Sequence, residues 1–415
     1  MRIWRILTLP AFARYWTGDT AVRLVDELTA VAILWYLAAY GHSARELGWY
    51  AFWTAAPVLA GGPLMATLFR RFPVRTIMVG DFAIRSLRYG VLAVALAAAR
   101  PGTVHWIWFD MAAAAQALVF MATAAGGPAL WPQVVPGPLL KHAMQAEQIG
   151  WNIAAVLGPL AAGLVMQRLG LWIILATASA LLALAAWNLA QVSLSAGTRT
   201  PVAPLRTSRP VTAREVLRIM RAHPPLWQST ALFWSLNLVQ GFLWVLWPLL
   251  AHAFWNSPGM LYTALLTTQA VGTLSGSVLL PTVVKRPSLL QRILLTESLA
   301  GMAMILVLLG LRHPQWAFIA VFVSACLGGS SPFLAMQIRF HATTADERPV
   351  VMTYIRTALQ TAGPLGGLLA GFAWHSQRAG ILVSGAALTL TLPPLIGAML
   401  AVRRPLAPPP AADRF

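Results

Sequence analysis

Long apolar segments recur along the whole chain, and they limit its fold more than any other feature of the sequence. A helix needs about 20 apolar residues to cross about 30 Å of hydrocarbon, because lipid offers the backbone no hydrogen-bond partner. Twelve segments meet this requirement, at residues 16–40, 47–69, 76–99, 104–130, 143–167, 171–192, 228–252, 259–283, 290–311, 315–339, 350–374 and 379–402. The sequence therefore predicts an all-α polytopic membrane protein with twelve transmembrane helices in the lipid bilayer.

The composition excludes a soluble globular protein. Of the 415 residues, 58% are hydrophobic and only 10% are charged, whereas about 25% are charged in an ordinary soluble domain. A soluble protein of this size could not cover its surface with so few charges. The single cysteine, Cys326, stands in an apolar run, which excludes a disulfide scaffold and a cysteine-based zinc site. We expect neither a metal nor a cofactor.

The formal net charge of +18 is explained by where the basic residues stand. Arginine and lysine crowd alternate connections, and the opposite connections hold only Arg45, Arg100, Arg168, Arg312 and Arg378. Such a bias marks the cytoplasmic side of a membrane protein. We therefore expect a multi-pass protein of the cell inner membrane with both termini cytoplasmic. A nucleic-acid partner is excluded, because it would need one clustered basic surface.

The chain divides at its only long polar segment. We expect an N-terminal six-helix bundle over 1–192, a basic cytoplasmic central loop over 193–225 with a short helix at 212–221, a C-terminal six-helix bundle over 226–404, and a disordered, proline-rich tail over 405–415. A repeated fragment supports two pseudo-symmetric halves. Gly158-Pro159-Leu160 recurs six spans later as Gly363-Pro364-Leu365.

Several local patterns resemble the major facilitator superfamily over about residues 10–402. They are similar in particular to its drug and siderophore exporter branch, which contains macrolide-efflux and enterobactin-exporter-like proteins. In the first span the pattern is Phe12-Ala13-Arg14-Tyr15-Trp16. In the signature loop between spans two and three it is Gly62-Pro63-Leu64 through Arg71-Phe72 and Arg75, and Asp81 and Arg85 follow this loop. A further pattern, Trp131-Pro132 through Gly158-Pro159, leads into span five. The last pair resembles the superfamily's antiporter motif. The resemblance implies a transporter in which two six-helix halves rock about a central cavity.

The signature loop departs from the family pattern. Arg70 stands where relatives carry an aspartate, and Pro73 stands where they carry a glycine. In the family, that aspartate faces the positive amino-terminal end of helix eleven, which would repel an arginine. Asp346 and Glu347 precede that helix here. We therefore expect the two charges of this gating contact to be exchanged.

Charged residues within the first span are the leading functional candidates, because an ionisable group in hydrocarbon costs on the order of 3 kcal/mol unless it meets water or a partner. Arg23, Asp26 and Glu27 fall at i, i+3 and i+4, so we expect Arg23 to pair with one of the two carboxylates. Two interpretations stay open: a proton-coupling site, or a structural ion pair. These charges, with Arg14, also favour an anchoring span over a cleavable signal.

Other buried charges admit similar pairs of interpretations. Glu147 is a candidate for coupling or gating, or a partner of Lys141 or His142. Glu297 belongs to span nine, which is peripheral in this family, so a packing role is favoured over proton coupling. Asp81, Arg85 and Arg88 repeat at one-turn spacing on span three, which favours a cytoplasmic-side network that steadies one transport state over contact with the substrate.

The seventh span carries a stripe typical of a ligand cavity. Trp234, Asn237, Gln240, Trp244 and Trp247 recur every three or four residues. The resemblance places helices one, four, seven and ten around the central cavity, and aromatics mixed with amides suit an amphipathic substrate. We expect Asn237, Gln240 and Trp244 to line it, with Gln116 and Asn152 adding polar contacts. We assign Trp247 to the belt of tryptophans at the membrane surface.

Motifs of enzymes are absent from the sequence. It holds no Walker A loop, no H-E-x-x-H, no G-x-S-x-G and no dinucleotide fingerprint. We expect a monomeric, non-enzymatic secondary transporter that exports an amphipathic small molecule, drug-like or siderophore-like, and the resemblance implies protons as the coupling ion. Two alternatives stay open: a lipid or lysophospholipid flippase of the same fold, and a non-transporting membrane scaffold.

Overall fold

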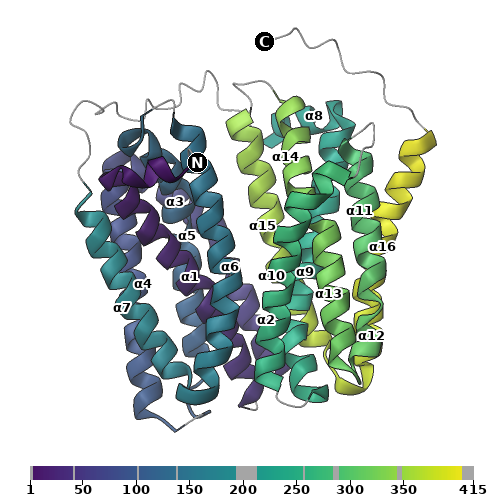
Figure 1. Cartoon of the computed structure of the whole chain (residues 1–415), viewed down its shortest axis with the longest axis horizontal. Helices are drawn as coiled ribbons and strands as arrows, with labels where there is room; N and C mark the ends of the chain where they lie inside the picture. The colour runs from purple at the N-terminus through teal and green to yellow at the C-terminus, as the bar shows by residue number, and fades with distance from the viewer. Residues whose placement is uncertain are drawn as a thin grey trace.

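The structure, a computed structural model, describes residues 3–40, 43–100, 102–136, 139–192, 213–255, 258–283, 289–343 and 348–403. Over these ranges the chain is helical and contains no strand. The helices form two groups that stand side by side, as Figure 1 shows. The predicted all-α architecture is confirmed.

The N-terminal half contains the first six predicted spans. A short 3-10 helix, η1 (Ile3–Thr8), precedes α1 (Pro10–Ala39), α2 (Ala44–Trp53), α3 (Val58–Arg71), α4 (Val74–Ala98), α5 (Ile107–Val134), α6 (Leu140–Leu169) and α7 (Leu171–Ala190). Helix α1 begins six residues before the predicted span, because Pro10 occupies the first turn, where its missing N–H is not needed. The second span is split into α2 and α3 at residues 54–57, next to Pro57.

The C-terminal half contains the other six spans and one short amphipathic helix. Its elements are α8 (Ala213–Ala222), α9 (Pro224–Phe254), α10 (Pro258–Val283), α11 (Leu289–Met304), α12 (Val307–Gly310), α13 (Pro314–Gly328), α14 (Ser331–His341), α15 (Arg348–Ala373), η4 (Ser376–Arg378) and α16 (Ala379–Arg403). Helix α8 matches the short helix predicted in the central loop. It packs Val216, Ile219 and Met220 against Leu226 and Ile355.

Six helical stretches are apolar and long enough on their own to cross a membrane: 142–169, 171–190, 224–254, 289–310, 314–339 and 376–397. The other spans carry more charge, are shorter, or are broken. Helix α1, for example, carries Arg14, Asp19, Arg23, Asp26 and Glu27. Arg23, Asp19 and Asp26 form ion pairs inside the bundle, and Glu27 lines internal cavities, so the segment still fits a membrane-spanning role.

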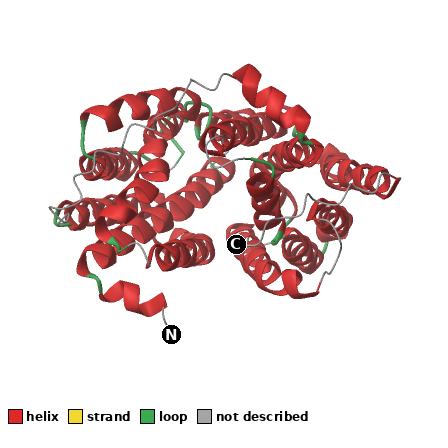
Figure 2. Ribbon diagram, turned by 90° about the horizontal axis from the view of Figure 1, so that it is seen from above, coloured by secondary structure: helices red, strands yellow, loops and turns green. Residues whose placement is uncertain are grey.

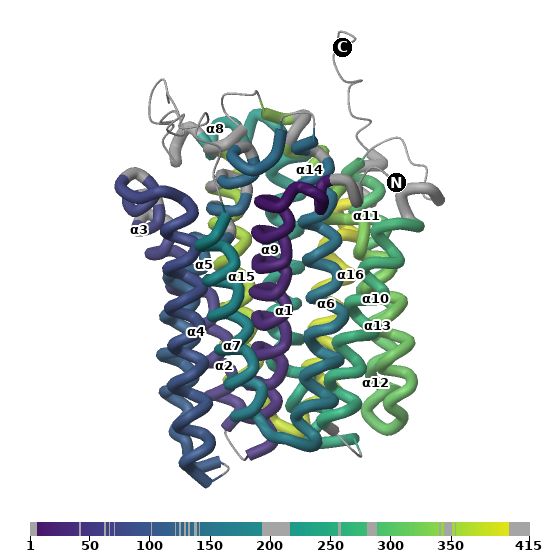
Figure 3. Tube along the Cα trace, turned by 60° about the vertical axis from the view of Figure 1, so that its left-hand side comes forward, coloured from purple at the N-terminus to yellow at the C-terminus, as the bar shows by residue number. Residues whose placement is uncertain are grey.

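The backbones of the two halves come closer together at one end than at the other, over the described residues (Figure 1). We call the end where α1 begins and α16 finishes the near end, and the opposite end the far end; α8 and α14 also lie at the near end (Figure 3). Figure 1 shows the halves meeting at the far end and diverging toward the near end. Seen from above, the helix ends fall into two groups (Figure 2). The backbones of the two halves therefore lie farther apart at the near end than at the far end (Figure 1).

The contacts between the halves are related by pseudo-symmetry. Helix α2 packs against α15, and α6 packs against α10. Counted as membrane spans, the first contact joins span two to span eleven, and the second joins span five to span eight. Exchanging the two halves therefore converts one contact into the other. A side chain on Gly48 would lie 3.1 Å from the Cα of Gly371, so a glycine is needed where α2 crosses α15.

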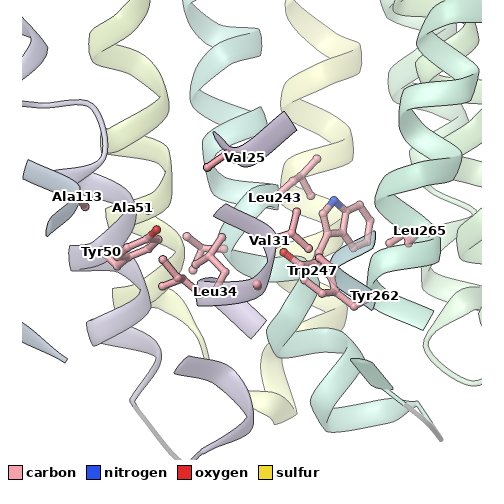
Figure 4. Close-up of a cluster of buried hydrophobic side chains, with 14 of the residues drawn as sticks. Val25, Val31, Leu34, Tyr50, Ala51, Ala113, Leu243, Trp247, Tyr262 and Leu265 are labelled. Carbon is pink, nitrogen blue, oxygen red and sulfur yellow. The ribbon is translucent and has the colours of Figure 1, made fainter. Parts of the chain in front are cut away.

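Aromatic pairs close the far end. Tyr50 of α2 stacks on Trp244 of α9 with 6.4 Å between ring centroids, and Trp35 of α1 stacks on Tyr262 of α10 at 5.9 Å. Figure 4 shows Tyr50, Trp247 and Tyr262 within one buried cluster that draws side chains from both halves. We call the four stacked residues the far seal. Each such pair contributes about 0.5–1.5 kcal/mol beyond the area that it buries.

Candidate functional site: charged networks around central cavities

Three neighbouring cavities lie between the halves. The Gln116 cavity, of about 350 Å³, is bounded by α1, α2, α4, α5 and by Trp244 from the other half. The Glu147 cavity, of about 300 Å³, is bounded by α1, α4, α5, α6 and by Arg356 of α15. The Asn237 cavity, of about 320 Å³, lies between α2 and helices α9, α10 and α15. Asp26 and Glu27 line both of the first two cavities.

One buried arginine joins two acidic residues beside these cavities. Arg85 is 1% exposed; its Nη1 donates to both carboxylate oxygens of Asp26 at 3.1 and 2.8 Å, and its Nε donates to Asp81 at 2.8 Å. The Asp81–Arg85 pair arises from i, i+4 spacing on α4. Thr123 of α5 donates to the second oxygen of Asp81. The network ties α1, α4 and α5 together.

Gln116 extends this network into the Gln116 cavity. Its amide nitrogen donates to Asp26 at 2.8 Å, and its amide oxygen accepts hydrogen bonds from Arg88 and, at 3.1 Å, from Tyr89. The hydroxyl groups of Tyr89 and Thr29 are 2.7 Å apart. Gln116 therefore lines the cavity, and its amide is held by the protein's own polar and charged groups.

The predicted pairing of Arg23 with Asp26 or Glu27 is wrong. Arg23 donates to Asp19 at 2.6 Å and to Glu147 of α6, and its guanidinium lies over the ring of Trp151. Asp26 is instead held by Arg85, since α1 turns the two residues toward different neighbouring helices. Asp19 was missed from the sequence, although its four-residue spacing from Arg23 was a visible signal.

Glu147 has two partners that the sequence did not indicate. Its carboxylate accepts from Arg23 and, at 3.3 Å, from the hydroxyl of Tyr15, and no described hydrogen bond joins it to His142. The reason is that α6 places Glu147 against α1 across the bundle. Glu147 therefore lines the cavity named after it. The side chain of Lys141 lies outside the described residues, so a pair between Lys141 and Glu147 stays a prediction.

Glu27 differs from the other carboxylates of α1. No hydrogen bond or ion pair joins it to another residue in the described part of the chain, and it lines both the Gln116 and the Glu147 cavities. Its side chain packs on Gly158 of α6, where an added Cβ would clash with the Cβ of Glu27. Gly158, from the Gly158-Pro159 pair that resembles the antiporter motif, thus lies directly against Glu27.

The stripe on α9 is divided among several environments. Asn237, Gln240 and Trp244 line the Asn237 cavity, as do Gly363 and Pro364 of α15. Trp247 is 3% exposed inside the protein, so its assignment to a surface belt is wrong; α9 turns this face toward the core. Asn152 accepts from Gln148 at 3.3 Å and lines none of the three central cavities.

The family of the chain follows from comparison with known proteins. A family model described as Major Facilitator Superfamily matches residues 18–367. The chain belongs to the Major Facilitator Superfamily. It is therefore a transporter rather than an enzyme, and it carries out secondary transport by alternating access. No curated protein matches the chain.

Solved structures share the superfamily fold along nearly the whole chain. A bacterial homolog of the human lysosomal transporter Spinster, inward-facing and unoccupied, is 14% identical with a TM-score of 0.67 and covers 97% of this chain and 96% of its own. A peptide transporter POT is 15% identical at a TM-score of 0.73, covering 94% of each chain. The nucleoside transporter NupG is 10% identical at 0.72, covering 93% of this chain and 99% of its own. At these identities the likeness shows the fold alone.

The superfamily signature loop lies at the near end. Gly62 and Arg70 belong to α3, and Arg71 is exposed at its last position. The guanidinium of Arg75 donates to the carbonyl oxygen of Val192 at 2.6 Å, beyond the end of α7, so the loop anchors a second span. Asp346 and Glu347 lie outside the described residues. The exchanged charge contact with Arg70 stays a prediction.

Proposed function

We propose that this protein is a proton-coupled exporter of amphipathic small molecules, drug-like or siderophore-like, acting as a monomer in a bacterial inner membrane. The observation that carries the proposal is Glu27, a carboxylate without an ion pair to any described residue, placed where two central cavities meet. Asp26, one residue away, is already held by Arg85. Glu27 is therefore the acidic group best placed to exchange a proton with cavity water.

The orientation of the open cavity follows from charge. The connections at the near end carry most of the arginines, which are typical of the cytoplasmic side. With both termini cytoplasmic, the structure is the inward-facing state. The far seal then separates the central cavities from the outside.

Arg356 supplies a means of coupling. It projects from α15 of the C-terminal half into the Glu147 cavity, which Glu27 lines from the other half. Closing the near end brings these opposite charges together, so a charged Glu27 favours the outward-facing state. A proton taken up from outside neutralises Glu27, weakens this attraction, and lets the protein return inward.

The substrate class follows from the cavity walls. Tyr50, Tyr89, Phe109, Phe120 and Trp244 line the Gln116 cavity. Aromatic rings beside a few amides and charges accommodate a molecule with apolar and polar faces.

Energised efflux tests the proposal. Cells expressing the wild type, Glu27→Gln or Asp26→Asn are loaded with a dye, a macrolide or a catecholate siderophore, and efflux is followed with and without an uncoupler. We expect uncoupler-sensitive efflux in the wild type and its loss in Glu27→Gln at equal membrane expression. The matched control is Glu46→Gln on α2, because glutamine can keep the capping-box bond of Glu46 to the Ser43 amide.

Other results would redirect the assignment. Uncoupler-sensitive efflux that survives Glu27→Gln but not Asp26→Asn would place proton coupling on Asp26. A change in membrane lipid composition without efflux of any probe would favour the lipid flippase. No efflux and no lipid change would contradict the transport proposal and favour the scaffold.

A further inference from the structure

A separate cavity of about 410 Å³ lies inside the C-terminal bundle. Helices α9, α10, α11, α13, α14, α15 and α16 all contribute to its wall. It meets the Asn237 cavity at Asn237, Gln240 and Trp247, which line both. Unlike the central cavities, it is bounded by residues of one half only.

Glu297 places an acidic group in this cavity. It is the only acidic residue between positions 216 and 345, and it is 8% exposed. Ser331 is a polar neighbour of its carboxylate, and no ion pair joins Glu297 to another described residue. A carboxylate at this depth is costly without a cationic partner, so its presence calls for an explanation beyond packing.

The carboxylate lies beside a turn within the helical stretch 314–339. Helix α13 ends at Gly328 and α14 begins at Ser331, and the two residues between them keep α-helical backbone angles. A Cβ on Gly328 would lie 3.4 Å from Oε1 of Glu297. The turn and the buried acid thus fall on the same cavity wall.

Arg339 brings an opposite charge to the same cavity. Its buried Nε has no hydrogen-bond partner among the described residues, and its guanidinium lies 5.9 Å from the ring centroid of Phe233. Arg339 lies on α14 eight residues after Ser331, a rise of about 12 Å toward the near end. Within the described chain, no ion pair joins Arg339 to Glu297. The cavity therefore holds two opposite charges at different depths, and no ion pair joins either of them to a described residue.

We propose that this cavity binds a small zwitterion, with its amine at Glu297 and its anionic group at Arg339. A simple cation would leave the guanidinium unpaired, and a simple anion would leave the carboxylate unpaired, whereas a zwitterion satisfies both. The wall between them includes Leu236, Leu243 and Leu390, which suits an aliphatic segment separating the two charged groups. The site lies within one half and does not depend on the transport proposal.

Binding of ω-amino acids tests the proposal. The full chain is purified into lipid nanodiscs, which leave both faces accessible, and its thermal unfolding is followed with probes from glycine to aminooctanoate, and with pentylamine and pentanoate. We expect stabilisation that peaks at one chain length, because the ligand must span a fixed distance. Pentylamine and pentanoate should bind at least tenfold more weakly than the best ω-amino acid.

Two variants connect the effect to the named charges. In Arg339→Gln the preference for the zwitterion over pentylamine should disappear, and in Glu297→Gln the preference over pentanoate should disappear. Because each result is a ratio of affinities within one variant, a general loss of stability does not imitate it. Arg378→Gln, on the exposed η4, and Glu27→Gln, in the central cavities, should keep the preference.

Three results would overturn the proposal. They are no stabilisation by any ω-amino acid, equal binding of pentylamine to the wild type, and loss of the zwitterion preference in Glu27→Gln. The first result would show that the protein has no zwitterion site. The second would show that the site binds a cation only, and the third would show that the ligand binds in the central cavities. None of them bears on efflux, so failure here and failure of the exporter proposal are distinguished.

Discussion

Arg85 is the residue on which the charged interior of the N-terminal half depends. It is fully surrounded by protein, and it holds Asp26 from α1 and Asp81 from its own helix. Buried ion pairs add little net stability, but removing one partner leaves a charge without compensation. Here removal would leave two neighbouring carboxylates.

Arg85→Met should therefore destabilise the protein strongly. We expect a loss of about 3–5 kcal/mol, because the variant leaves the buried Asp81 and the partly exposed Asp26 without their shared cation. Thermal unfolding in nanodiscs measures the change. Arg100→Met, at an exposed position after α4, is the control and should change the midpoint little. Equal stability of the two variants would show that Arg85 is dispensable for the fold.

At the scale of helices, glycines decide how closely spans approach. Gly158 lets α6 lie directly against Glu27 of α1, and Gly48 does the same for α2 against α15. Helix association in membranes relies on such close packing, because lipid supplies no hydrophobic drive between helices.

Gly158→Ala should separate α6 from α1. The added methyl group would clash with Glu27, and overpacking of this kind costs about 1–3 kcal/mol. Gly80→Ala is the matched control, because Gly80 also lies within a helix and a Cβ there meets nothing within 4 Å. We expect a lower unfolding midpoint for Gly158→Ala and an unchanged or slightly higher one for Gly80→Ala. The same midpoint in both would contradict the close contact.

At the scale of the whole molecule, the two halves are joined at the far end and diverge at the near end (Figure 1). The far seal and the Gly48 crossing hold the state that is open toward the near end. Weakening the Gly48 crossing should shift the population toward the state in which the far end is open. The equilibrium between the two states depends on the difference in their stability, and the crossing stabilises only one of them.

Gly48→Val should open the far end. A single cysteine at position 54, in a Cys326→Ser background, reports access to the Gln116 and Asn237 cavities, which Thr54 lines. We expect a membrane-impermeant maleimide added outside intact cells to label it several-fold faster in Gly48→Val than without that substitution. Gly380→Val should not change labelling, since an added Cβ there meets nothing within 4 Å. Unchanged labelling in Gly48→Val would show that this crossing does not hold the far end closed.

The spans, the helix in the central loop and the division into halves could be predicted from the sequence, because each follows from local apolarity, charge and chain length. The positions of Asn237, Gln240, Trp244 and Gln116 on cavity walls also followed from helical spacing combined with the family resemblance. The partners of Arg23 and Glu147, the burial of Trp247, and the meeting of Glu297 with Arg339 in one cavity did not follow. Those depend on how far each helix is rotated and which neighbour it faces, and that rotation is decided by the packing of all the helices together.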